Sequence, residues 1–96
     1  MTHPARRYFP ATKSALVVLG AEIKEKRKKR GYSEAELARQ AKCSRETIRA
    51  IEAGKPTVEI GLFFDVAARV GLIVFGTPEE LLLRRIRIQE SMKPTA

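Results

Sequence analysis

Two short helical segments, each preceded by a serine, constrain the fold of this chain more than any other feature. Ser33 is followed three residues later by Glu36, the spacing at which each side chain accepts a hydrogen bond from the other residue's backbone amide. Ser44 stands before Arg45 as a second good N-cap, and Gly54 closes the segment that follows. Two helices of about nine residues joined by a turn of about three are therefore predicted, which is the outline of a helix-turn-helix.

A helix is expected ahead of this pair, over residues 14–30. Leu16, Leu19 and Ile23 recur at intervals of three and four residues, which places them on one face of a helix. Gly20 lies inside the stretch, where it disfavours helix by up to about 1 kcal/mol relative to alanine. It either separates a short leading helix from the main one or allows a second helix to approach closely.

Two further helices and a strand are expected in the remainder of the chain. Residues 60–70 carry an apolar stripe with helical spacing, and Thr77 followed by Pro78 opens a last helix. Residues 72–75 are apolar on both alternations and lie between two glycines, which predicts a short strand covered on both faces. Since the chain has no second strand of that quality, this one is expected to pair antiparallel with its copy in a second chain. The alternative is an irregular segment packed on the core of one chain.

These elements predict a mainly α fold, a five-helix bundle with one C-terminal strand that pairs across a dimer. The expected parts are a basic N-terminal arm over 1–13, a helix-turn-helix domain over 14–71, a dimerisation segment over 72–92 and a frayed tail over 93–96. The expected dimer interface consists of Leu62, Val66, Leu72, Ile73, Val74 and Phe75.

The charge of the chain indicates a polyanionic partner, because the formal net charge is +8. Nine Lys or Arg against two acids lie in residues 1–31, whereas residues 32–71 hold six of each. Charge alone leaves other interpretations open, since a basic run is also typical of a solvated helix face.

Several functional classes are disfavoured by what the sequence lacks. One Cys and one His exclude a cysteine zinc site, and no metal or cofactor is expected. No catalytic constellation or phosphate-binding loop is recognisable, so we do not expect an enzyme. No apolar run is long enough to span a bilayer and no secretory signal is evident, so a cytoplasmic location without a membrane partner is expected.

The central part of the chain resembles the Cro/phage-repressor (XRE-type) helix-turn-helix family over residues 19–71. The resemblance is carried by Leu19-Gly20-Ala21-Glu22-Ile23-Lys24, Arg30-Gly31-Tyr32-Ser33, Ala41-Lys42-Cys43-Ser44 and Ile51-Glu52-Ala53-Gly54. It implies that the second helix of the motif enters the DNA major groove. The helix and strand that follow resemble the layout of HipB-like antitoxins, which implies a partner toxin, a HipA-like kinase.

The resemblance places the base-reading residues at the start and on the outer face of the motif's second helix: Ser44, Arg45, Glu46 and Arg49. An arginine here can donate two hydrogen bonds to guanine O6 and N7, with phosphate contact as the alternative. Glu46 either accepts from cytosine N4 or holds Arg49 and stabilises the helix dipole. Candidate phosphate contacts are Lys28, Lys29, Arg30, Ser33, Lys42 and Lys55.

A structural salt bridge between Arg27 and Glu52 is also implied by the resemblance. Three residues depart from the family pattern. Glu34 stands where glutamine is frequent, and an acid there repels phosphate unless it points away or stabilises the helix dipole. Lys42 stands where glycine is frequent, and Cys43 is either a small buried hydrophobe or a redox-sensitive thiol.

The leading hypothesis is a sequence-specific repressor that binds a palindromic operator as a homodimer, in the role of a HipB-like antitoxin that regulates its own operon. One alternative is a stand-alone or phage-type regulator without a toxin partner. The other is a protein-interaction module whose basic surface meets an acidic protein.

Overall fold

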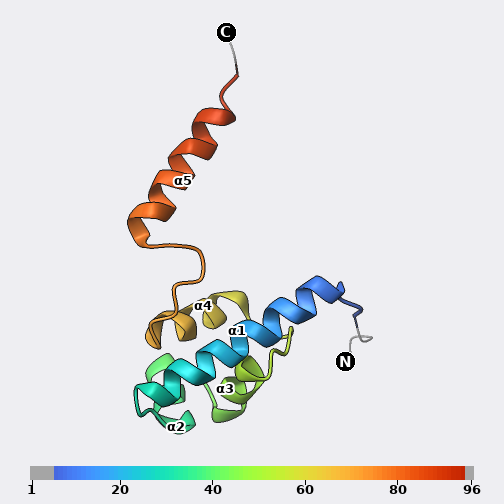
Figure 1. Ribbon diagram of the computed structural model, residues 1–96, viewed down its shortest axis with the longest axis vertical. Helices are drawn as coiled ribbons and strands as arrows, with labels where there is room; N and C mark the ends of the chain where they lie inside the picture. Colours follow the sequence, from blue (N-terminus) through green and yellow to red (C-terminus); the bar gives the residue numbers. More distant parts are fainter. Residues whose placement is uncertain (1–5, 95–96) are drawn as a thin grey trace.

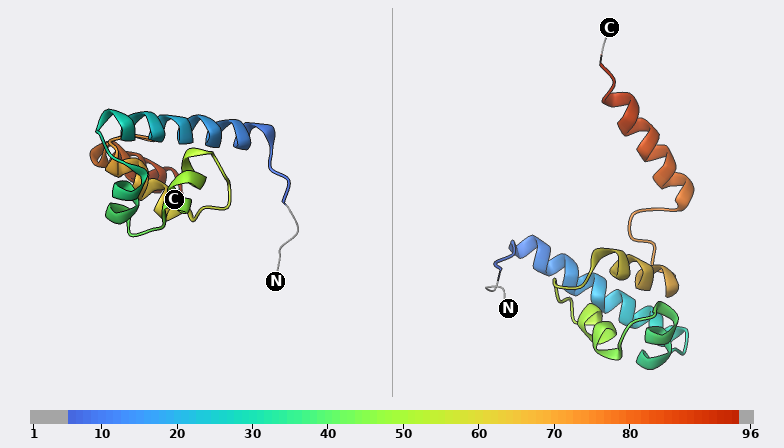
Figure 2. Two further views of the ribbon diagram at one scale, coloured as in Figure 1. Left: turned by 90° about the horizontal axis from the view of Figure 1, so that it is seen from below. Right: turned by 180° about the vertical axis from the view of Figure 1, so that it is seen from behind.

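Five helices make up the part of the chain that the computed structural model describes, residues 6–94. They are α1 (Pro10–Lys29), α2 (Glu34–Ala41), α3 (Arg45–Glu52), α4 (Ile60–Arg69) and α5 (Pro78–Ser91). Helix α1 packs on α3, and α2 packs on both α3 and α4, while α5 stands away from the other four (Figures 1 and 2).

The core lies between the first four helices. Its fully buried side chains come from each of them: Ile23 from α1, Leu37 from α2, Ile48 and Ile51 from α3, and Val66 from α4. Burial of one such side chain stabilises the fold by about 1.5–3 kcal/mol. The core, with α1 and α2 packed on α3, therefore fixes the position of α3 and leaves its outer face exposed.

Helix α1 is longer than expected and is not interrupted. It begins at Pro10, which suits the first position of a helix, so the arm predicted over 1–13 ends at Phe9. Residues 1–5 of that arm lie outside the described part of the chain. A Cβ atom on Gly20 would lie 2.5 Å from the carbonyl oxygen of Ile51. Of the two roles considered for Gly20, close approach of a second helix is therefore correct and a helix break is wrong.

The predicted helix caps are present at both helices of the motif. The Ser33 hydroxyl accepts a hydrogen bond from the backbone amide of Glu36 at 3.0 Å, and the Ser44 hydroxyl accepts one from that of Thr47 at 3.1 Å. Lys42 forms the turn with a left-handed backbone, φ 56°. These local interactions set the start of α3 and its angle to α2.

Residues 72–75 form a bent linker, and no strand occurs in residues 6–94. The backbone amide of Gly71 bonds to the carbonyl of Ala68, and that of Leu72 to the carbonyl of Ala67, which is the Schellman arrangement at the end of α4. Leu72 is buried because it closes this cap. The prediction of a strand is wrong because an apolar residue after a helix-ending glycine fits the cap of a helix as well as it fits a β pattern.

The predicted dimer interface also needs correction. Val66 is fully buried and Leu72 nearly so, hence both belong to the core and cannot meet a second chain. Leu62 and Val74 are partly buried against that core. Only Ile73 and Phe75 are open to solvent, at 66% and 61% exposure.

Helix α5 buries none of its side chains. The radius of gyration is 16.4 Å, whereas a compact chain of this length has about 12–13 Å, because α5 extends away from the domain (Figure 1). No helix among the described residues is both long and apolar enough to cross a membrane. Of the tail predicted over 93–96, residues 95–96 lie outside the described part.

Candidate nucleic-acid interface

Helix α3 is built to present one face to a ligand. Ile48 and Ile51 are buried on its inner side, whereas Arg45, Glu46 and Arg49 are exposed on the other. The Ser44 cap holds the first turn in place, so the exposed side chains project from a rigid helix. This is the arrangement that a major-groove reading helix requires.

Arg45 and Glu46 are available for new contacts. Within residues 6–94, no side-chain hydrogen bond or ion pair involves either of them. Ser44 differs, because its hydroxyl also lies 2.9 Å from the Thr47 hydroxyl and is engaged as the cap. Of the predicted base-reading residues, Arg45 and Glu46 are thus the two whose side chains carry no structural role.

Arg49 is held by a partner that the sequence interpretation did not assign to it. Its Nε lies 3.2 and 3.3 Å from the two carboxylate oxygens of Glu34, the first residue of α2. The side chains are 56% and 28% exposed, so the pair contributes at most about 1 kcal/mol to stability. Glu34 therefore points at Arg49, which shows how an acid is accommodated beside the helix that is expected to face DNA. The pair spans two helices, and only their crossing geometry reveals it.

Some of the candidate phosphate contacts are exposed lysines, and others are side chains that already form hydrogen bonds within the chain. Lys42 is exposed in the turn before α3, and Lys55 is exposed after it and lines the same depression as Glu46. Lys28 is exposed on α1, and Lys29 lies 3.8 Å from Glu25 one turn away. Lys42 and Lys55 are therefore exposed on either side of α3, one before its start and one after its end.

Arg30 and Ser33 have structural roles that the phosphate assignment did not anticipate. Arg30 Nη1 donates to the carbonyl oxygen of Arg69 at 2.9 Å, which ties the end of α1 to the end of α4. A Cβ atom on Gly71 would lie 2.5 Å from Arg30 Nη2, so the glycine makes room for this guanidinium. Ser33 is occupied as the cap of α2.

Arg27 and Glu52 form an ion pair beneath this surface. Arg27 Nε lies 2.7 Å from Glu52 Oε2 and Nη2 lies 3.2 Å from Oε1, while Nη1 donates to the Tyr32 carbonyl at 2.8 Å. The two side chains are 8% and 5% exposed. The hydrogen bond to Glu52 raises the pKa of Arg27, against burial, and the charges of Glu52 and Glu34 add to the rise. The pair joins α1 to the end of α3.

Cys43 packs as a small hydrophobe in the turn. It is partly buried against the core. Burial raises the pKa of its thiol, and the charge of Asp65 adds to the effect. The thiol is therefore protonated at neutral pH, which favours the packing interpretation over a redox role.

Comparison with known families agrees with this geometry. A helix-turn-helix family model matches residues 23–72, more than half of the 96-residue chain. The chain belongs to this helix-turn-helix family. The matched domain is of the XRE type and is a DNA-binding module of a transcription regulator. The match runs from the last third of α1 to the cap of α4, so α5 lies outside it. No curated protein and no solved structure matched the chain in the corresponding searches.

Proposed function

We propose that the chain is a repressor that reads a palindromic operator as a homodimer, with α3 of each copy in the major groove. The observation that carries this is the outer face of α3, where Arg45 is exposed and unpaired one turn from Arg49. Two arginines at this spacing suit guanines of one half-site, each through O6 and N7. Glu46 between them suits a cytosine N4 donor.

The homodimer follows from the size of one module. A single module of this kind buries roughly 600–1,000 Å² on DNA and binds weakly alone. Two copies related by a two-fold axis double the contacts and require an inverted repeat, with half-sites about 34–36 Å apart. Lys42 and Lys55, at the two ends of α3, supply phosphate contacts that set its register.

Selection of bound sequences from a random duplex pool tests the proposal. We expect an enriched inverted repeat with half-site centres about one helical turn, or a small multiple of it, apart. The same repeat should be protected in a footprint. A pool in which no sequence is enriched, with binding that merely follows salt concentration, would overturn sequence reading and favour a non-specific basic surface.

A role as an antitoxin that binds a HipA-like kinase is a second proposal. Its support is the exposed apolar side chains of α5, which give a partner protein a surface, because the strand that the resemblance in layout includes is not formed in residues 6–94. Co-purification with a kinase encoded beside the gene is the expected result. Repression of its own promoter with no such kinase nearby would favour a stand-alone or phage-type regulator.

A further inference from the structure

Helix α5 exposes large apolar side chains around most of its circumference. They are 43–65% exposed and comprise Leu81, Leu82, Leu83, Ile86 and Ile88, and Met92 at the C-cap is 76% exposed. An isolated helix of 14 residues is marginal in water, since helices of this length depend on packing for their stability. The helix therefore requires a surface that this chain does not itself provide.

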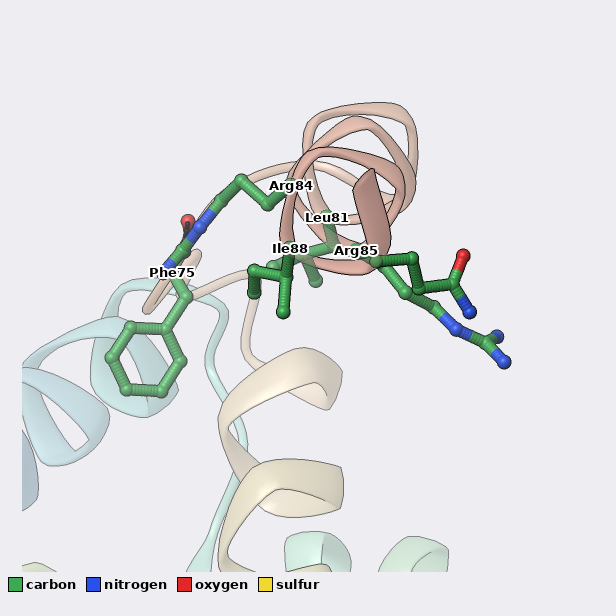
Figure 3. Close-up of a pocket in the computed structure, with 6 residues that line it drawn as sticks. Phe75, Leu81, Arg84, Arg85 and Ile88 are labelled. Carbon is green, nitrogen blue, oxygen red and sulfur yellow. Dashed lines mark hydrogen bonds between the residues drawn. The ribbon is translucent and has the colours of Figure 1, made fainter. Parts of the chain in front are cut away.

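An open apolar groove lies between α5 and the domain. Figure 3 shows Leu81 and Ile88 on the side of α5 that faces α4, with the ring of Phe75 beside them. A cavity of about 440 Å³ lies among these residues. A second, of about 460 Å³, shares Phe75 and Leu81 and reaches Phe64 and Ala67 of α4. The groove thus continues from the underside of α5 to the domain.

The charges along α5 indicate which molecule covers its apolar side chains. Glu79 and Glu80 lie in its first turn, Arg84, Arg85 and Arg87 follow in the middle, and Glu90 lies in the last turn, where it pairs with Lys93. A parallel copy would set acid against acid and arginine against arginine. An antiparallel copy, in the register that sets Glu79 opposite Arg87, places the acidic first turn of one helix against the arginines of the other. Within residues 6–94, neither Glu79 nor Arg87 has an ion-pair partner.

We propose that α5 pairs antiparallel with α5 of a second copy of this chain, and that the pair fills the apolar groove beside Phe75. The apolar side chains of α5 cover a wide enough arc of the helix for two contacts. One is with α5 of the second copy, and the other is with the domain of helices α1–α4. This inference deepens the proposed homodimer by naming its surface. It replaces the interface predicted over residues 72–75.

Charge reversal measured by sedimentation tests the pairing. Glu79→Arg and Arg87→Glu are each expected to raise the self-association Kd about tenfold, because every substitution acts twice in a two-fold pair. The double variant E79R/R87E is expected to return the Kd to within about threefold of the parent. A monomer at all concentrations, or a double variant weaker than both single ones, would overturn the proposal.

Substitutions of apolar residues distinguish self-association through α5 from non-specific hydrophobic association. Leu82→Ala with Ile86→Ala is expected to abolish self-association, whereas Val18→Ala, at an exposed position on α1, leaves it unchanged. Self-association lost in Val18→Ala but retained in the α5 variant would place the interface elsewhere. None of these measurements uses DNA, so their failure is distinct from a failure of DNA reading.

A second inference concerns the pair between α2 and α3. Arg49 uses only Nε on Glu34, and no hydrogen bond within residues 6–94 uses its two terminal nitrogens. Those nitrogens carry four N–H groups, enough for a two-bond contact with guanine. We infer that Glu34 is a positioning residue, which holds the Arg49 guanidinium over a base and keeps it from nearby phosphates. This inference rests on the proposed reading of DNA by α3.

Glu34→Gln tests this role, since it preserves size but removes the charge. We expect affinity for random DNA to rise about threefold, because an acid near the phosphates is lost, and the ratio of cognate to random affinity to fall about tenfold. Glu25→Gln removes an equal charge from an exposed pair on α1 and is expected to leave the ratio unchanged.

The outcomes separate the two claims. A wild-type protein that prefers no sequence would overturn the proposed function. A wild-type protein that prefers one, together with a Glu34→Gln variant whose ratio is unchanged, would overturn the role of Glu34 alone.

Discussion

Helices α1–α4 and helix α5 use similar side chains in opposite ways. In the first region the branched aliphatic residues Ile23, Ile48, Ile51 and Val66 are buried against one another. In α5 every side chain is exposed, although the helix is capped as α2 and α3 are, with Thr77 accepting from the Glu80 amide at 3.2 Å. Local signals thus form helices equally well in both regions. What differs is whether the same chain supplies a surface to cover the apolar face.

The largest expected difference in stability between the two regions is at two isoleucines. Ile51→Ala leaves a cavity in the core, and we expect a loss of about 2–5 kcal/mol in the free energy of unfolding. Ile86→Ala on α5 is expected to change it by less than about 0.5 kcal/mol in the monomer. Urea titrations at concentrations too low for self-association measure both. Equal losses would contradict the division into a packed domain and an unpacked helix.

The next largest expected effect is at the ion pairs inside helices α1–α4. Glu52→Gln leaves Arg27 buried without a counter-charge, and we expect a loss of about 3 kcal/mol. Asp65→Asn breaks an exposed pair with Arg69 on α4 and is expected to lose less than about 1 kcal/mol. Thermal unfolding of both variants at one pH makes the comparison. A Glu52→Gln protein as stable as the parent would show that burial does not govern this pair.

The turn between α2 and α3 offers the smallest effect. Lys42→Gly relieves a left-handed backbone and is expected to stabilise the domain by about 0.5–1 kcal/mol. The same change at Lys24, an exposed position inside α1, is expected to destabilise it by about 1 kcal/mol. Calorimetry of the two variants measures the difference. A lower melting temperature for Lys42→Gly would mean that the lysine side chain contributes more than its backbone strain removes.

Much of the domain could be predicted from the sequence because its signals are local. The caps at Ser33, Ser44 and Thr77 each need only a residue three positions further on, and the structure contains all three. The strand prediction at residues 72–75 failed for a local reason as well, since Leu72 ends a helix cap. The same apolar pattern at residues 72–75 fits both a short strand and a linker that begins with a helix cap.

The missed features depend on tertiary geometry. Glu34 meets Arg49, and Arg30 meets the carbonyl of Arg69, only after helices distant in sequence have packed. No spacing rule within one element encodes such contacts. The exposure of α5 was missed for a related reason: residues 72–92 are expected from the sequence to dimerise through a paired strand, and that strand does not form in the described chain.

The central claim, that α3 reads bases through Arg45, is tested most directly by one comparison of affinities. Wild type and Arg45→Ala are titrated at one salt concentration against the selected operator and against a random duplex. The account predicts a loss of about 1–3 kcal/mol on the operator and a much smaller loss on random DNA. Equal weakening on both duplexes would make Arg45 a phosphate contact and contradict the account.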